Sequence, residues 1–305
     1  METQKVAAIF GLLLLGFFLK KLPFKEETKE KIPLILNKVI IYICLPSLIL
    51  KVMPNLGFKE ESWSYPLSHW FTLFILATLT YTISKALKLE RKTVGCLLIL
   101  VPLGNTSFFG YPMVEIFFGE EALPYAILYD QMGSFLGLAL YAPFILSIYG
   151  GEKIPSFTTF FKKIGGFPPL IALIISFSFK EVLLNEIIQT VITPLSKGVI
   201  PLAMIAVGFQ FQKPSPELGL PLTLGLFFKM VISPLIALLF FKIFGTFDQP
   251  EKVVIFQSAM PPMITAAILA SEKGLNKNLS ISLTGIGLLL AFILLPLYFG
   301  FLKLI

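Results

Sequence analysis

Apolar runs of membrane-crossing length dominate this sequence and are joined by short polar or basic loops. A bilayer core about 30 Å thick needs roughly 20 apolar residues for one helical crossing. Lipid offers no partner to backbone N–H and C=O groups, so each crossing segment must satisfy them within a helix. We expect an all-α polytopic membrane protein with ten crossings, near residues 6–22, 33–53, 66–87, 93–118, 122–148, 166–180, 187–210, 219–243, 252–272 and 279–302.

The composition agrees with a membrane location. Charged residues make up 14% of the 305-residue chain and hydrophobic residues 56%. An average soluble domain carries about 25% charged residues. The first run is not expected to be a cleaved signal peptide, because Glu2 interrupts the basic start and no small-x-small cleavage site follows.

The chain has a net charge of +7, and its lysine and arginine residues are divided unevenly between the predicted loops. Fifteen lysine and arginine residues lie in the odd-numbered loops, against seven in the termini and the even-numbered loops. Loops rich in lysine and arginine stay on the cytoplasmic side, so both termini are expected outside a cell membrane. The excess of basic residues therefore indicates how the chain is oriented in the membrane, and no nucleic-acid partner is expected.

Two of the predicted crossings are interrupted. The run 93–118 contains Pro102, Gly104 and Asn105 near its middle, with Pro112 beyond them, and the run 253–271 is broken at residues 259–262. Unwound backbone in hydrocarbon costs several kcal/mol for each unsatisfied group. Such breaks predict a polar cavity at membrane depth, and two of them in corresponding positions are typical of a transporter binding site.

The sequence also carries a weak internal repeat. A shift of 155 residues aligns Gly11 with Gly166, Pro46 with Pro201, Pro66 with Pro221 and Gly119 with Gly274. The same shift places the Gly104–Asn105 break on Ala259–Met260. Residues 1–150 and 151–305 would then hold five crossings each, and an odd number makes the second half enter from the opposite side. We predict one integral membrane domain of two inverted five-helix repeats, with the site at their interface.

Four segments carry a family resemblance. They are L-G-N-T-S-F-F-G-Y-P (Leu103–Pro112), F-G-E-E-A-L-P-Y-A-I-L-Y-D-Q (Phe118–Gln131), N-K-V-I-I-Y-I-C-L-P-S-L (Asn37–Leu48) and S-A-M-P-P (Ser258–Pro262). Together they resemble the auxin efflux carrier family, which includes plant auxin exporters and prokaryotic permeases for organic acids such as malate and malonate. The resemblance implies ten helices in two inverted repeats, crossover helices four and nine, and outside termini.

Two departures from the plant members favour a compact prokaryotic type of permease. Plant members carry a large hydrophilic loop between crossings five and six, whereas Gly150–Gly165 is a short connector here. Pro262 stands where plant members tend to have a polar residue. The resemblance implies a secondary transporter that exports or imports a small organic anion, such as a carboxylate or an auxin-like acid, by an elevator type of alternating access.

Asn105 is the first candidate for substrate contact, because its amide offers both donors and an acceptor and it matches the family's asparagine at the crossover. Gly104, Thr106, Ser107 and Gln257 complete the predicted substrate-binding set. A half-helix that starts near Ser107 would point its positive end at an anion. The alternatives are that Asn105 only caps that half-helix and that the two hydroxyls bond their own backbone.

The prolines at the breaks are expected to shape the site without binding substrate. Proline removes a helix hydrogen bond and clashes with the preceding turn, so Pro102, Pro112, Pro261 and Pro262 would hold the helices open. For Pro112 alone, an ordinary helix kink is the alternative.

Asp130 lies eight residues into the fifth crossing, where a carboxylate is expensive and usually functional. It is expected to couple transport to a proton with Gln131 beside it, to pair with Lys229 or Lys197, or to lie on a wetted surface. Lys197 and Lys229 are also candidate counter-ions for an anionic substrate. Proton coupling and a homodimer stay open at this point.

Other functional classes have less support. An intramembrane enzyme would need an H-E-x-x-H site or apposed aspartates, but His69 is the only histidine and is expected to be a polar anchor near an interface. We predict no catalytic residue, metal or cofactor. A sodium-coupled symporter of the bile-acid type is the alternative, since it needs clustered oxygen ligands. The candidates for those ligands are Asn105, Thr106, Gln131, Gln257, Ser258 and Glu272. A receptor or a channel is a further alternative.

Overall fold

The computed structural model describes residues 2–56, 59–151, 156–214, 219–245 and 247–305. Within these ranges the regular structure is helical, and the one β feature is an isolated bridge. Six helical segments of the described residues have the length and composition to cross a membrane: Glu26–Asn55, Glu60–Ala86, Glu120–Tyr149, Glu186–Gln210, Gly219–Phe244 and Lys277–Leu304. They correspond to six of the predicted crossings.

The other predicted crossings are helical as well, but shorter or interrupted. The first is α1 (Glu2–Lys21), and the sixth is the short apolar α10 (Pro168–Ser178). The fourth is divided into α5 (Arg91–Leu100) and α6 (Gly110–Phe118). The ninth is divided into α16 (Gln249–Ser258) and α17 (Ile264–Glu272). Both breaks expected from the sequence are therefore present, while the inverted repeat stays a prediction.

The remaining elements follow the same pattern of helices with short interruptions. The α-helices are α2 (Glu26–Val39), α3 (Leu45–Val52), α4 (Ser64–Ala86), α7 (Leu123–Tyr129), α8 (Leu136–Tyr149), α9 (Phe157–Gly165), α11 (Lys180–Leu183), α12 (Glu186–Ser196), α13 (Val199–Gln210), α14 (Gly219–Phe227), α15 (Ser233–Phe244) and α18 (Lys277–Leu304). Three π-helical turns lie inside long helices: η1 (Ile40–Cys44), η5 (Asp130–Phe135) and η6 (Phe228–Ile232). Three short 3-10 turns are η2 (Met53–Asn55), η3 (Glu60–Trp63) and η4 (Glu120–Ala122).

Several helix ends follow from local sequence. Asp248 forms a capping box with Glu251 at the start of α16, and its own N–H donates to Glu251 Oε2 over 2.9 Å. The side chains of Asn185 and Asn276 accept backbone N–H groups at the starts of α12 and α18. Gly119 ends α6 with a φ of +92°, a conformation that side chains with a Cβ rarely adopt.

The connector expected at Gly150–Gly165 contains more structure than a simple loop. Residues 152–155 of it lie outside the described part of the chain. The residues that follow form α9, so much of this connector is helical.

The chain divides into two compact units, and each takes segments from both halves of the sequence. The first unit is Met1–Lys59, Ser107–Ile127 and Phe161–Phe211, and the second is Glu60–Thr106, Leu128–Phe160 and Gln212–Ile305. These units are a different division of the chain from the predicted repeats 1–150 and 151–305.

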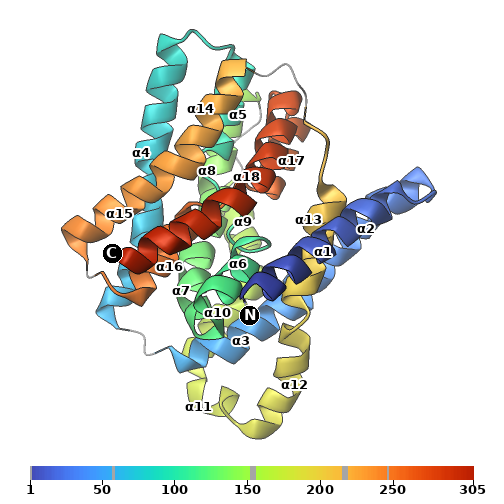
Figure 1. Cartoon of the computed structure of the whole chain (residues 1–305), viewed down its shortest axis with the longest axis vertical. Coiled ribbons are helices and arrows are strands. Elements are labelled where there is room, and N and C mark those ends of the chain that lie inside the picture. The colour runs from blue at the N-terminus through green and yellow to red at the C-terminus, as the bar shows by residue number, and fades with distance from the viewer. Residues whose placement is uncertain (1, 57–58, 152–155, 215–218, 246) are drawn as a thin grey trace. The chain divides into compact units, whose positions relative to one another are not determined.

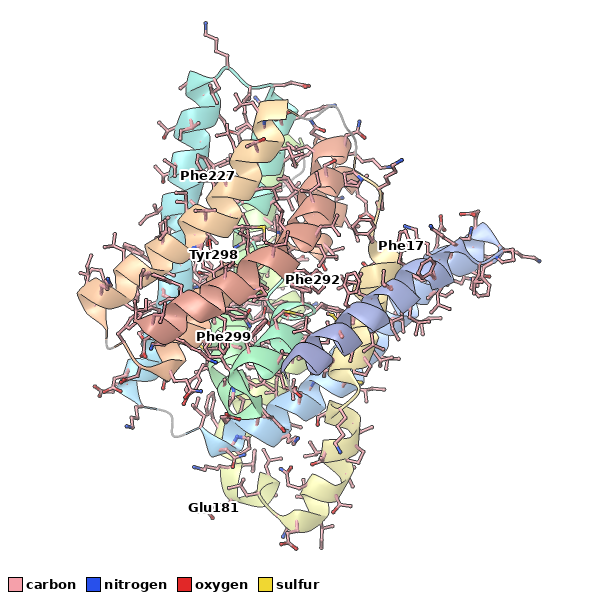
Figure 2. The ribbon with its side chains drawn as sticks, viewed as in Figure 1. Phe17, Glu181, Phe227, Phe292, Tyr298 and Phe299 are labelled. Atoms are coloured by element: carbon pink, nitrogen blue, oxygen red, sulfur yellow. The ribbon has the colours of Figure 1, made fainter. Side chains whose placement is uncertain are left out.

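In the first unit, α1 packs along α13 at backbone distance (Figure 1). A Cβ added to Gly16 would lie 2.1 Å from the carbonyl oxygen of Ile205, and one added to Gly208 would lie 2.0 Å from that of Leu13. Phe17, labelled in Figure 2, packs edge-on against Phe211 with 5.8 Å between ring centroids. The glycines therefore permit a contact that larger residues would prevent.

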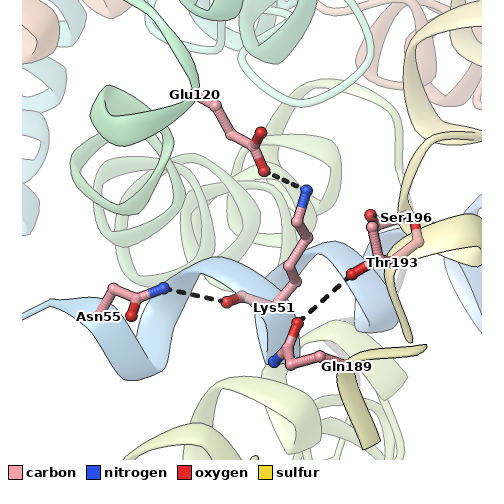
Figure 3. A network of polar contacts seen from close by, with 6 residues as sticks. All are labelled: Lys51, Asn55, Glu120, Gln189, Thr193 and Ser196. Carbon is pink, nitrogen blue, oxygen red and sulfur yellow. Dashed lines mark hydrogen bonds and ion pairs between the residues drawn. The ribbon is translucent and has the colours of Figure 1, made fainter. Parts of the chain in front are cut away.

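The same unit contains a polar contact network on α3 and α12 (Figure 3). Lys51 Nζ forms an ion pair with Glu120, and its carbonyl accepts a hydrogen bond from Asn55 Nδ2 over 3.4 Å. On α12, Thr193 Oγ1 donates to Gln189 Oε1 over 3.4 Å. Since Lys51 and Glu120 are partly exposed, this pair contributes about 1 kcal/mol or less.

In the second unit, α4 packs against α5 and α15, and α5 also packs against α8, α17 and α18. Tyr298, labelled in Figure 2, donates its hydroxyl to the carbonyl of Met230 over 2.6 Å and ties α18 to η6. Gly225 on α14 faces Leu97 and Leu283, where an added Cβ would come within 3.0 Å of either side chain. Leu103 and Met260, one in each helix break, are fully buried.

Candidate functional site

The two helix breaks pair with one another inside the second unit. Gly104 and Pro262 form an antiparallel bridge. The N–H of Asn105 donates to the carbonyl of Pro261 over 2.8 Å, and the N–H of Met263 donates to that of Leu103 over 3.0 Å. Each break therefore satisfies backbone groups of the other, which removes much of the cost of unwinding both helices.

Buried amide side chains flank this pairing. Asn105 and Gln257 are 5% and 0% exposed. Gln257 Nε2 donates to the carbonyl of Thr106 over 3.2 Å, which links α16 to the first break. Gln257 Oε1 is buried and has no hydrogen-bond partner among the described residues. An unsatisfied buried carbonyl oxygen costs about 1–3 kcal/mol, so this atom is a candidate ligand-contacting group.

Asp130 is joined to the first break. It is 1% exposed and is the first residue of the π-helical turn η5. Its carboxylate accepts hydrogen bonds from Thr106 Oγ1 and, over 2.7 Å, from Gln131 Nε2. Of the three expectations for Asp130, a wetted surface position is therefore wrong. π-helical turns are frequent at functional sites because they displace one residue from the regular helix surface.

Lys229 belongs to the same cluster. It is 2% exposed and lies in the π-helical turn η6. Its ammonium donates to the carbonyl of Ser258 over 3.1 Å, and Ser233 Oγ donates to the same oxygen over 3.0 Å. A Cβ added to Gly104 would lie 3.0 Å from Lys229 Nζ. The ammonium thus lies against both breaks, and its described partner is a main-chain carbonyl rather than Asp130.

His69 is buried in the protein, whereas a polar anchor near an interface would be exposed. It is 2% exposed, and its ring packs edge-on against Tyr129 with 5.0 Å between centroids. Ser134 Oγ lies 3.5 Å from its Nδ1, and Nε2 has no partner among the described residues. The position of a lone histidine near the end of an apolar run was the only sequence signal, and it pointed to the membrane surface.

The start of α6 differs from the expectation for the first break. The half-helix was predicted to begin near Ser107, but α6 begins at Gly110 with Phe109 at the N-cap position. The alternative role of Asn105 as its N-cap is therefore wrong. Ser107 belongs to the first unit and is half-buried.

The prolines have different positions relative to the breaks. Pro102 lies in the turn that follows α5, and Pro261 and Pro262 lie between α16 and α17. Pro112 instead lies in the first turn of α6, between Tyr111 and Met113, whose N–H groups donate to the carbonyls of Ser107 and Phe109. Its role in holding the break open, or in a simple kink, stays a prediction.

The structure separates the two candidate lysines. Lys197 belongs to the first unit, is exposed, and follows the last residue of α12. Lys229 and Asp130 both belong to the second unit and are buried. Among the described residues, no group of three His, Cys, Asp or Glu side chains has the arrangement of a metal site.

Comparison with known proteins extends over nearly the whole chain. The sequence profile of a family described as membrane transport protein matches residues 2–299. An uncharacterized transporter of Methanocaldococcus jannaschii is 28% identical over 278 residues, which are 87% of each chain. An uncharacterized transporter of Methanothermobacter thermautotrophicus is 29% identical over 304 residues, which are 97% of each chain.

Proposed function

Because the chain belongs to the membrane transport protein family, which is the auxin efflux carrier family, we propose that it is a secondary transporter of a small organic anion. It is a multi-pass membrane protein with several apolar helices of crossing length. The observation that carries the proposal is the backbone pairing of two interrupted helices beside buried polar side chains. In transporters, substrate sites are formed by discontinuous helices of this kind.

The chemistry around the paired breaks suits a carboxylate. Asn105 and Gln257 bring amide N–H donors, and Gln257 uses one of its two in the bond to Thr106. The Lys229 ammonium adds a positive charge close to Gly104. Hydrogen bonds from amides to an ionised carboxylate are stronger than those between neutral groups, which favours an anionic substrate over a neutral one.

Alternating access by two inverted repeats is the mechanism we propose. The π-helical turn η1 spans residues 40–44, and a shift of 155 moves this range to 195–199. The shifted range encloses the interruption between α12 and α13. The same shift relates the break at Gly104–Asn105 to Ala259–Met260. Irregular backbone thus recurs at matching positions in residues 1–150 and 151–305. This recurrence supports crossover helices at crossings four and nine, with movement of one repeat-derived bundle against another.

Proton coupling through Asp130 is part of the proposal. Its carboxylate is bonded to Thr106, whose backbone carbonyl is bonded to Gln257. Protonation of Asp130 would turn an acceptor into a donor and would weaken the bond that it accepts from Thr106 or from Gln131. The charge state of this carboxylate would thereby affect the backbone of the first break, where we place the substrate.

A thermal-shift screen tests the substrate class. Purified protein is heated with mono- and dicarboxylates, and the Asn105→Ala variant is compared with Asn55→Ala, which removes an exposed asparagine. A carboxylate present at about 100 times its Kd stabilises the native state by about 2.7 kcal/mol. We expect this gain in the wild type and in Asn55→Ala but not in Asn105→Ala. If no carboxylate stabilises the wild type, the organic-anion proposal is rejected.

Flux into liposomes tests the transporter class separately. Saturable countertransport of the stabilising carboxylate is expected of a carrier. A conductance that does not saturate would instead identify a channel.

A further inference from the structure

Lys229 presents the most unusual charge in the described part of the chain. Lysine is almost never fully buried unless its charge is compensated. Here the side chain is 2% exposed, and no ion pair involves it among the described residues. Its described hydrogen bond goes to the main-chain carbonyl of Ser258. The described hydrogen-bond partner of this amino group is therefore a backbone oxygen and not a carboxylate.

The carbonyl that holds the ammonium is at a special place in the fold. Ser258 is the last residue of α16, so its carbonyl lies at the negative end of that half-helix. Ser233 Oγ donates to the same oxygen, which places the serine beside the ammonium. In transporters with interrupted helices, the C-terminal ends of half-helices and unwound carbonyls coordinate the coupling cation. Lys229 occupies a position of this type.

Gly104 leaves room for the ammonium on the other break. A Cβ at this position would lie 3.0 Å from Lys229 Nζ, 3.1 Å from Cε and 3.4 Å from the carbonyl oxygen of Met260. The ammonium therefore lies between the first break and the carbonyl groups that end α16. A free monovalent cation at this point would meet the same oxygens and would be repelled by Lys229.

We propose that the Lys229 ammonium is a covalently attached cation that takes the place of a free coupling Na⁺ at the paired helix breaks. The inference rests on the proposed transporter function and deepens it, because it separates this chain from a sodium-coupled symporter. A tethered cation neutralises the negative ends of the carbonyl groups and holds the two breaks together in every transport state. The chain then needs no Na⁺ for stability or flux.

The first test uses the wild-type protein without any organic anion. Its melting temperature is measured in NaCl, KCl and choline chloride at equal ionic strength. We expect equal values in the three salts. Stabilisation by Na⁺ over choline would reveal a free cation site and would overturn the proposal. Because no carboxylate is present, this result is independent of whether the organic-anion assignment is correct.

The second test removes the tethered cation. Lys229→Ala leaves a small space beside the Ser258 carbonyl, and we expect a lower melting temperature that rises by roughly 2–4 °C with saturating Na⁺ or ethylammonium but not with choline. Lys229→Met fills the space without charge and should show no cation response. Lys197→Ala removes an exposed lysine and should behave as the wild type.

The outcomes of the second test are also decisive. A Lys229→Ala protein with an unchanged melting temperature and no cation response would overturn the proposal. If Lys229→Ala does not fold in any salt, the flux of Lys229→Met is compared with that of the wild type to test the proposal. Wild-type flux in Lys229→Met liposomes would then show that no cation is needed at this place.

Discussion

Asp130 shows how one buried side chain can connect ionisation to the backbone of a proposed site. Its carboxylate accepts from Thr106 Oγ1 and Gln131 Nε2, and Thr106 belongs to the first helix break. An amide in the same place keeps the shape and one acceptor but cannot gain or lose a proton. This difference separates a coupling role from a purely structural one.

Asp130→Asn is expected to remove the dependence of flux on a pH gradient. In the wild type, acidification protonates the carboxylate, so flux should change as an imposed gradient is reversed. The variant should retain flux that is the same at each pH, with a stability loss of about 1 kcal/mol for the altered hydrogen bonds. Uptake into liposomes at several internal and external pH values measures this. Glu272→Gln, at an exposed carboxylate, is the matched control. Flux through Asp130→Asn that keeps the wild-type pH response would exclude Asp130 as the proton carrier.

Gly104 is a second residue whose effect follows from local geometry. Its missing side chain accommodates Lys229, so Gly104→Ala should push the ammonium from the Ser258 carbonyl. Loss of a hydrogen bond from a charged group costs about 1.5–3 kcal/mol, and a lower melting temperature is the expected result. Gly300→Ala is the control, because an added Cβ there has no atom within 4 Å. A Gly104→Ala protein as stable as Gly300→Ala would show that the ammonium is not confined as described.

At the scale of helices, interruptions rather than regular turns distinguish this molecule. The π-helical turns η5 and η6 carry Asp130 and Lys229, and the two broken helices pair through their extended residues. These two turns thus present buried ionisable side chains to the cluster in the second unit, and the two breaks present backbone groups that pair with one another. The interior of a regular helix could not offer such backbone groups, because they are already bonded internally.

The contact between α1 and α13 allows a prediction about packing in the first unit. Gly16→Ala places a methyl group 2.1 Å from the carbonyl oxygen of Ile205, so the helices must separate. We expect a loss of about 1–3 kcal/mol from this overpacking. Gly11→Ala, in the same helix, meets no atom within 4 Å and should stabilise by up to about 1 kcal/mol.

Thermal or denaturant unfolding of the two alanine variants measures this difference. Equal stability of Gly16→Ala and Gly11→Ala would mean that α1 and α13 are not in backbone contact.

At the scale of the whole molecule, the arrangement of the chain across the membrane is the main prediction. The excess of lysine and arginine in odd-numbered loops places both termini outside. Cys44 and Cys96 are free thiols but are buried, so they should react poorly with a membrane-impermeant maleimide. New cysteines can therefore report topology on this background.

Single cysteines test the orientation. Ile305→Cys at the exposed C-terminus should be labelled in intact cells, whereas Glu90→Cys before α5 should be labelled only after the membrane is opened. The physical reason is that charged loops cross a bilayer only at high cost, so each loop stays on one side. Labelling of Glu90→Cys in intact cells, with protection of Ile305→Cys, would reverse the predicted topology.

Much of the architecture could be predicted from the sequence, because membrane crossing depends on local length and hydrophobicity. The apolar runs, the break after Leu100 and the break after Ser258 all follow from residues close together in the chain. Asp130 and Lys229 were recognisable for the same reason, since charges within apolar runs are expensive. The division of the chain into its two contact units was not predicted, because it depends on contacts between distant segments.

The sequence by itself determined that this chain is a helical membrane protein with two interrupted crossings and a few charges inside apolar runs. Only the tertiary structure decided the surroundings of those groups: the Ser258 carbonyl beside Lys229, Thr106 beside Asp130, and a buried place for His69. The physical reason is that hydrophobicity acts through neighbouring residues of one segment. A hydrogen bond instead depends on positions within a few tenths of an ångström, which are set by helices far apart in the sequence.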